Sequence, residues 1–308
     1  MANEGSVRVP ELATTGKEVD CEIIDRNGIS YFRQRVDSKI YGYHTPSGEN
    51  RAVGVYDGHL NTTSYLDSIG MDKIAAHVGF SGFGQRTGCS TAAGGDDCWE
   101  GTATTCPIPD QVVGERLTIL CASASDTNGG IGINTLDIHG LDAAGNTQTE
   151  TIALNGGSVH TVRTDWRFNQ SIHMETVGSN GVAVGRISIH RFGDATRVYN
   201  VISAGGNMSL NAARMVPLGK TFYLKSRTVS GASSKAVSVR QRATSTFEDT
   251  LTVAWAFLFK QVWFVFNTAS TEVLPIPEKY PALSIVKATA YSAQAGGDYS
   301  FAYSGWYE

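Results

Sequence analysis

Cysteine is the residue whose placement most plainly suggests chemistry in this chain of 308 residues. Three of the five cysteines fall in a stretch rich in Gly, Ser and Thr, a composition that offers little burial to hold a loop in place. A disulfide closing a loop of about 10 to 15 residues would contribute roughly 3 kcal/mol by restricting the unfolded chain. We therefore expect at least one bridge among Cys89, Cys98, Cys106 and Cys121, with Cys89–Cys98 the first choice.

Other roles for the cysteines follow from their number and spacing. The intervals of 8, 7 and 14 residues between Cys89, Cys98, Cys106 and Cys121 differ from the paired CxxC spacing of structural zinc sites, so no metal centre is expected. Free thiols buried as small hydrophobic groups are the alternative to disulfides. The fifth cysteine, Cys21, makes the number odd and is the candidate for a link to another subunit.

Histidines and carboxylates form no recognisable catalytic pattern along the sequence. No two of the seven histidines stand at i, i+2 or i, i+4, and any carboxylate pair would have to come from different strands. The HExxH motif and the Gly-x-Ser-x-Gly elbow are also missing from the sequence. We therefore expect no catalytic residues, no cofactor and no bound metal, in a protein that is not an enzyme.

Composition excludes two classes of partner. Charged residues make up 18 % of the chain and the net charge is −4, so no strongly basic surface is expected to bind nucleic acid. The most apolar stretch, residues 251–266, is interrupted by Lys260 and Gln261 and is shorter than the roughly 20 residues of a membrane-spanning helix. No secretory signal is recognisable at the N-terminus, and no membrane partner is expected.

The middle of the chain has the pattern of a β-sandwich. Apolar residues alternate in short runs, and Gly- and Asn-rich turns such as residues 126–130 and 142–146 separate these runs. Glycine and asparagine accept the positive φ angles of tight hairpin turns, and six or so short strands at this spacing are typical of a sandwich. The expected strands are 117–121, 133–138, 149–154, 159–166, 172–177 and 182–189.

A second block of alternation continues to the end of the chain. In the last run, Tyr299, Phe301 and Tyr303 share one face, which indicates a final strand paired within a sheet. The expected strands here are 198–202, 208–215, 221–229, 236–242, 251–259, 261–266, 283–291 and 299–303.

These patterns predict an all-β fold with four parts. Residues 1–76 form an extended N-terminal docking segment, because they have no sustained period; a short helix near residues 65–78 is the exception. Residues 77–110 form a Cys-rich loop region. Residues 111–193 and 194–308 form two consecutive antiparallel β-sandwich or jelly-roll-like domains.

The stretch from Cys121 to Asn146 resembles a recurrent module of tailed-bacteriophage virion proteins. Its marks are Ser-Ala-Ser-Asp-Thr at 123–127, Gly-Leu-Asp-Ala-Ala-Gly-Asn at 140–146 and Thr-Glu-Thr-Ile-Ala-Leu-Asn-Gly at 149–156. The likeness covers roughly residues 77–308, and its motifs are turn and strand motifs that carry no chemistry. The chain departs from the family pattern in its cysteines at 89, 98 and 106 and in its long N-terminal segment.

The resemblance implies a non-enzymatic structural component of a tailed-phage virion. Such a protein would decorate the capsid or belong to the neck, collar or tail, and would be assembled in the host cytoplasm. Its partners would be other copies of itself, in a trimer or higher ring, and virion proteins such as capsid, portal or neck proteins.

A host-glycan-binding module of the virion is the alternative function. Sugar rings stack on flat, exposed aromatic side chains, and Trp99 and Trp306 are the tryptophans expected in loop or terminal positions. They are therefore the candidate ligand platform. Trp166, Trp255 and Trp263 lie within apolar alternation and are expected to belong to the core.

Overall fold

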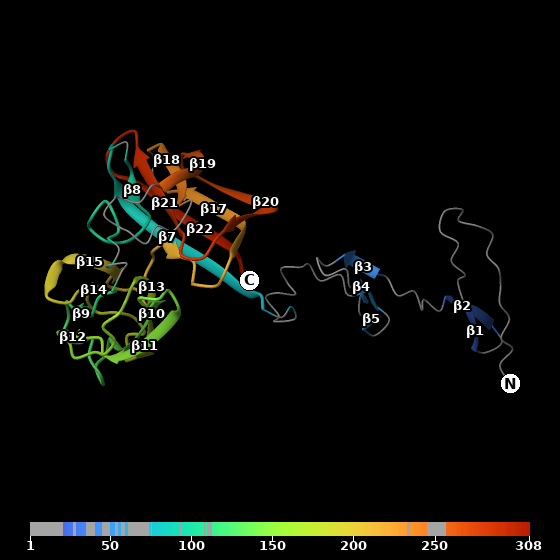
Figure 1. The fold of residues 1–308 in the computed structure, drawn as a ribbon, viewed down its shortest axis with the longest axis horizontal. Helices are drawn as coiled ribbons and strands as arrows, with labels where there is room; N and C mark the ends of the chain where they lie inside the picture. Colours follow the sequence, from blue (N-terminus) through green and yellow to red (C-terminus); the bar gives the residue numbers. More distant parts are fainter. Residues whose placement is uncertain are drawn as a thin grey trace. The chain divides into compact units, whose positions relative to one another are not determined.

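The computed structural model describes two compact units, Met1–Ser64 and Tyr65–Glu308. In the first unit it describes the backbone of six short strands that pair as three antiparallel hairpins (Figure 1). In the second unit it describes residues 74–308, apart from 75, 93, 108, 110–112, 233–234 and 245–256. The hairpins are β1 (Cys21–Arg26) with β2 (Ile29–Gln34), β3 (Tyr41–His44) with β4 (Asn50–Ala52), and β5 (Val55–Tyr56) with β6 (His59–Leu60).

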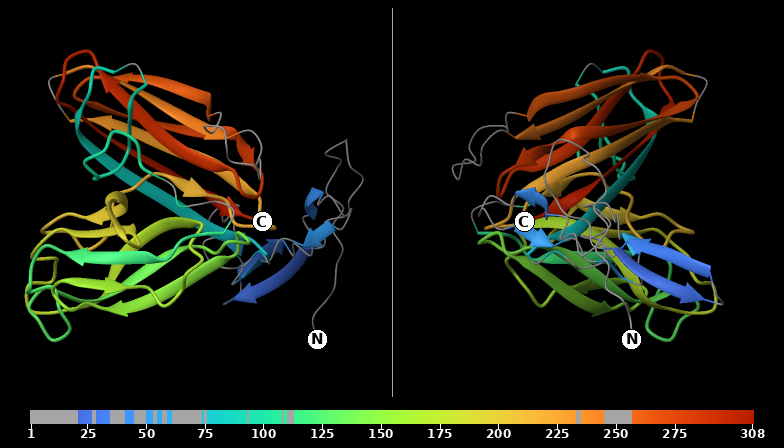
Figure 2. Two further views of the ribbon diagram at one scale, coloured as in Figure 1. Left: turned by 60° about the vertical axis from the view of Figure 1, so that its left-hand side comes forward. Right: turned by 90° about the vertical axis from the view of Figure 1, so that its right-hand side faces the viewer.

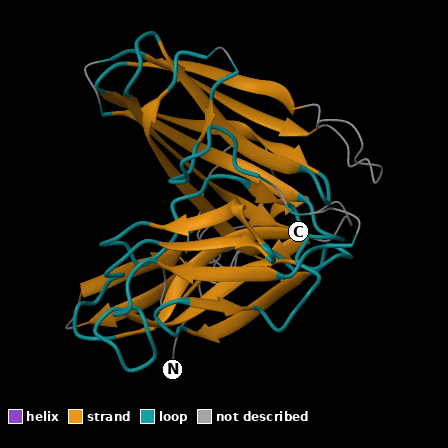
Figure 3. Ribbon diagram, turned by 90° about the vertical axis from the view of Figure 1, so that its left-hand side faces the viewer, coloured by secondary structure: helices purple, strands orange, loops and turns teal. Residues whose placement is uncertain are grey.

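Strands and loops account for all described residues, and none of these residues is helical (Figure 3). The predicted all-β class is therefore confirmed. Most of the helix expected near residues 65–78 lies outside the described residues, and Val78 itself begins a strand. No described segment is a helix long and apolar enough to cross a membrane.

The first sandwich packs a three-stranded sheet against a four-stranded sheet. Between them lies a core of apolar side chains that includes Ile119, Ile138, Trp166 and Ile187, all with 0 % exposure. The three-stranded sheet has the order β11 (Thr147–Ala153), β10 (Ile133–Leu141), β13 (Phe168–Val177). The four-stranded sheet has the order β12 (Ser158–His160), β9 (Leu117–Cys121), β14 (Ile187–Arg191), β15 (Asp194–Ile202).

The second sandwich has a larger core, in which Tyr299, Phe301 and Tyr303 are buried on one face as their alternation predicts. One sheet has the order β20 (Thr268–Tyr280), β17 (Phe222–Gly231), β22 (Gly297–Tyr307), β7 (Val78–Cys89). The other has the order β16 (Arg214–Met215), β21 (Ile285–Ser292), β18 (Val237–Thr244), β19 (Phe257–Val265), with β8 (Asp96–Asp97) also paired to β21.

Two chain segments separated by the first sandwich build this second sandwich. Strand β7 pairs along its length with β22, the last strand of the chain, as Figure 2 shows for the cyan and red ribbons. Strand β7 lies within residues 77–110, which were expected to form a loop because they are rich in Gly, Ser and Thr. At Gly82 a Cβ atom would lie 2.5 Å from the Tyr303 ring, and at Gly84 it would lie 2.4 Å from the backbone of Ala212. The glycines are therefore required by close packing within a strand.

Two further elements differ from the sequence-based expectation. Strand β15 begins the block expected to be the second sandwich, yet it pairs with β14 in the first. Strand β20 was not among the expected strands, and it contains Pro275 and Pro277. It is an edge strand that pairs with β17 alone, and proline is tolerated in edge strands because one side needs no backbone donors.

Candidate functional site

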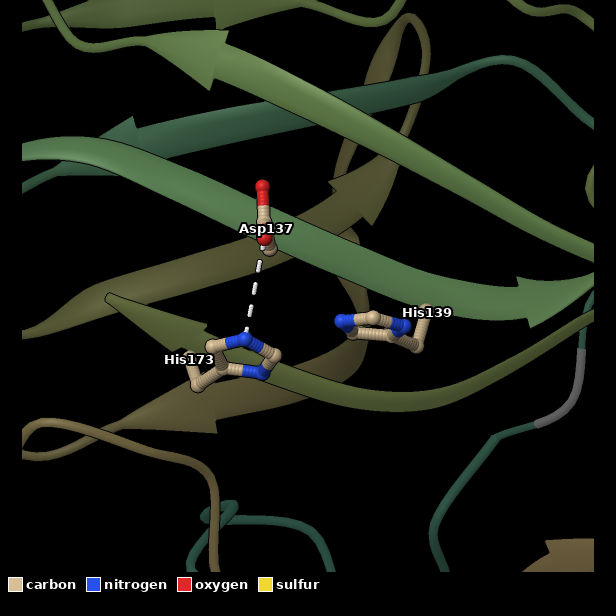
Figure 4. A group of neighbouring side chains, drawn as sticks. All are labelled: Asp137, His139 and His173. Carbon is tan, nitrogen blue, oxygen red and sulfur yellow. Dashed lines mark ion pairs between the residues drawn. The ribbon is translucent and has the colours of Figure 1, made fainter. Parts of the chain in front are cut away.

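A cluster of two histidines and an aspartate lies on the outer face of the three-stranded sheet in the first sandwich. Asp137 and His139 stand two residues apart on β10, so their side chains share a face, and the register of β13 places His173 opposite Asp137. Leu136 and Ile138, which alternate with them, are buried in the core. Figure 4 shows the three polar side chains gathered over these two strands.

The three side chains are close enough to act together. His173 Nε2 lies 3.7 Å from Asp137 Oδ2, and the rings of His139 and His173 are stacked with centroids 4.6 Å apart and planes 16° apart. One potential ligand atom from each of the three residues lies within 4.8 Å of the others.

Two threonines of the neighbouring strand β11 hold the cluster from the side opposite β13. Thr149 Oγ1 lies 3.0 Å from His139 Nδ1, and the Thr151 hydroxyl donates a hydrogen bond to Asp137 Oδ1. Both threonines are the register partners of the residues they contact. They therefore fix the orientation of the imidazole and of the carboxylate before any ligand binds.

The second ring nitrogen of His139 has no such contact. Within the described part of the chain, Nε2 is buried and has no hydrogen-bond partner. Burial lowers the pKa of His139, and the neighbouring His173 lowers it further, whereas Asp137 acts in the opposite direction. The surroundings thus favour the neutral form of the His139 imidazole, and its buried Nε2 makes no hydrogen bond within the described part of the chain.

The sequence offered a weak signal for this cluster. Asp-x-His at 137–139 in a predicted strand places a carboxylate and an imidazole on the same face of the sheet. The spacing of the histidines alone does not reveal this pair. His173 is 34 residues further on, and only the register of β13 against β10 brings it to Asp137.

The four described cysteines are free and buried, so the expected disulfide is not formed in this structure. The premise of a poorly buried loop is wrong, because Cys89 ends strand β7 and packs with Cys98 in the core of the second sandwich. Cys106 and Cys121 lie in two other apolar clusters. The side chain of Cys21 lies outside the described residues.

Burial also makes these thiols poor nucleophiles. It raises the pKa of Cys89 and of Cys106 to about 12, and that of Cys121 to about 11. The pKa of Cys98 is raised further by the same cause. Because the thiolate is the reactive form, the four thiols are expected to be inert packing groups at neutral pH.

The tryptophans proposed as a glycan platform are not exposed. Trp99 is buried and its Nε1 donates to the carbonyl oxygen of Ala103 at 3.0 Å. Trp306 is also buried, and its ring stacks on Tyr223 at a centroid distance of 5.3 Å. The expectation of a platform at these two positions is wrong. Trp306 lies near the end of β22 and Trp99 in the loop after β8, and both side chains are covered by neighbouring residues.

Exposed apolar side chains gather instead along β19 and the turn that follows it. We call Leu258, Phe259, Val262, Phe264 and Phe266 the apolar edge; Phe264 is 81 % exposed. Strand β19 pairs with β18 and ends its sheet, so its other side has no strand partner among the described residues. On the adjoining edge strand β20, Val273 and Ile276 are also exposed.

The comparisons with known proteins identify no family. No protein-family model matches the chain, and no curated protein matches it. A search of solved structures gives a chain from the structure of infectious bursal disease virus, Gt strain, that is 10 % identical, over 80 % of this chain and 76 % of that one. The TM-score of 0.17 is too low for this similarity to bear on fold or function.

Proposed function

We propose that the chain is a non-enzymatic structural component of a tailed-phage virion that assembles with copies of itself. The observation that supports self-association is the apolar edge, whereas the virion role rests on the sequence motifs that resemble virion proteins. Monomeric soluble proteins rarely leave a long apolar edge strand uncovered, because its free backbone groups and side chains favour pairing with another chain. A second copy would cover both the side chains of β19 and the side of its backbone that has no strand partner among the described residues.

The motifs that resemble virion proteins support the same function through their roles in the fold. Asp126 is fully buried and accepts hydrogen bonds from the backbone N–H groups of Ile133, Val184 and Gly185, at 2.8 to 3.0 Å. Asp142 accepts from the N–H of Asn146 at 2.8 Å and closes a hairpin turn. Both aspartates accept hydrogen bonds from backbone N–H groups, so these motifs stabilise turns of the fold. Such a role suits a structural protein.

Self-association through β19 can be tested with a surface variant. Phe264→Ser should shift the mass distribution of the purified chain, measured by mass photometry, from oligomers to monomers. The fold should be unaffected, because this side chain is 81 % exposed. Val162→Ser, which removes an equally exposed apolar side chain from the first sandwich, is the matched control and should leave the oligomers intact. A wild-type chain that is monomeric at all concentrations would contradict the assembly mechanism.

The virion location needs a separate measurement. Purified particles of the phage that encodes this chain should contain it at a fixed copy number, as measured by quantitative mass spectrometry. Cryo-EM density at the capsid surface, neck or tail should accommodate both sandwiches. Particles that lack the chain would overturn the proposed function, and selective binding on a glycan array would favour the receptor-binding alternative.

A further inference from the structure

We propose that Asp137, His139 and His173 form a binding site for a divalent transition-metal cation of the zinc type. Two imidazole nitrogens and one carboxylate oxygen are a ligand set that Zn²⁺ accepts, with one further position for water. This inference concerns the first sandwich alone and does not depend on where the protein acts.

The geometry of the cluster requires only side-chain rotation to reach coordination. Tetrahedral ligands about 2.0 to 2.1 Å from zinc lie roughly 3.4 Å from one another, and the three ligand atoms here lie within 4.8 Å. The two stacked rings lie in nearly parallel planes, 16° apart, and a nitrogen lone pair lies in the plane of its ring, so one ring must turn for both to meet the cation. The side chain of His173 is 41 % exposed and has room to turn, whereas the Asp137 carboxylate is largely covered.

The neighbouring strand supplies the supporting contacts of a metal site. In the tautomer in which His139 Nδ1–H donates to Thr149 Oγ1, the lone pair resides on Nε2, the buried nitrogen that has no hydrogen-bond partner in the described part of the chain. The Thr151 hydroxyl on Asp137 Oδ1 orients the carboxylate in the same way. Outer contacts of this kind are typical of metal-binding histidines and carboxylates. A cation would satisfy the one buried polar atom that the cluster leaves unpaired.

Titration calorimetry of the tag-free, metal-free full chain with ZnCl₂ tests the proposal. We expect one Zn²⁺ per chain and a rise in Tm, because a ligand that binds the folded state stabilises it. His173→Ala and Asp137→Asn should each weaken binding at least tenfold, while the matched control His160→Ala, an exposed histidine of the other sheet, should not change it. Thr149→Val should weaken binding about tenfold through loss of orientation.

A spectroscopic measurement distinguishes this site from the cysteines. Co²⁺ bound at the cluster should give a visible spectrum without a thiolate charge-transfer band. Circular dichroism of each variant checks that the fold is retained, and His173→Gln provides a second variant of similar size if the alanine variant unfolds. Absence of stoichiometric binding, a thiolate band, or equal affinity in folded Asp137→Asn and His173→Gln would overturn the proposal.

Discussion

At the scale of single residues, one buried carboxylate in the first sandwich binds several backbone groups at once. Asp126 is a clear case, because its carboxylate accepts hydrogen bonds from three backbone N–H groups, one at the start of β10 and two in the loop before β14. In the sequence it is one polar residue in a turn. In the structure it fastens the turn after β9 to the start of β10 and to the segment before β14.

Replacement of Asp126 by alanine should therefore greatly reduce the stability of the fold. Each buried N–H left without an acceptor costs about 1 to 3 kcal/mol, so we expect Asp126→Ala to lower the free energy of unfolding by at least about 3 kcal/mol. Urea denaturation followed by fluorescence measures the change. Asp142→Ala removes a turn aspartate at the surface and should cost about 1 kcal/mol or less; equal losses in the two variants would show that burial of the donors is not the cause.

At the scale of elements, buried charge connects the two sheets of the second sandwich. Arg227 on β17 is 3 % exposed and donates to Glu272 and Glu278 of β20 at 2.9 and 3.0 Å. It also donates to Gln241 of β18, in the opposite sheet, at 2.6 Å, and its guanidinium lies over the ring of Trp263. The cluster therefore holds the edge strand β20 in register and bridges the core.

Removal of this arginine should destabilise the sandwich more than removal of one of its partners. We expect Arg227→Met to cost about 3 kcal/mol, because Gln241 is fully buried and both glutamates lose their counter-charge. Glu272→Gln, at a position whose side chain is 39 % exposed, should cost less than about 1 kcal/mol. Thermal and urea unfolding measure both changes in stability. An Arg227→Met variant as stable as the wild type would show that the apolar core alone holds β20 in place.

At the scale of the whole molecule, the two units differ in how they are built. Each described strand of Met1–Ser64 pairs with a single neighbour, and an isolated two-stranded hairpin is marginally stable in water. Tyr65–Glu308 contains four-stranded and five-stranded sheets with extensive buried cores. Apolar residues of both sandwiches also meet in one cluster, where Leu141 and Phe168 pack with Met215 and Ile285.

Deletion of residues 1–60 should therefore leave a folded β-protein. We expect the truncated chain to retain the strand-rich circular dichroism spectrum and the urea midpoint of the full chain, because β7 and every later strand are present. We also expect it to be absent from phage particles, since the deleted segment is the proposed docking element. Complementation of a deletion phage with each form measures incorporation, and normal incorporation of the truncated chain would contradict the docking role.

The fold class and many strands could be predicted from sequence because their causes are local. Alternation decides which face of a strand is buried, and glycine supplies the positive φ of a turn, as at Gly129 and Gly145. Strands β9, β10, β17 and β18 accordingly lie where the alternation indicates.

Tertiary structure alone decided which distant segments meet. β7 finds its partner at the far end of the chain, and no local pattern distinguishes its packing glycines from those of a loop. The burial of Trp99 and Trp306 and of the four cysteines depends on the segments packed around them. The histidine cluster depends on strand register, because a shift of one residue would turn His173 to the opposite face of the sheet. Pairing across long sequence separations is set by the whole core, and a single sequence does not display it.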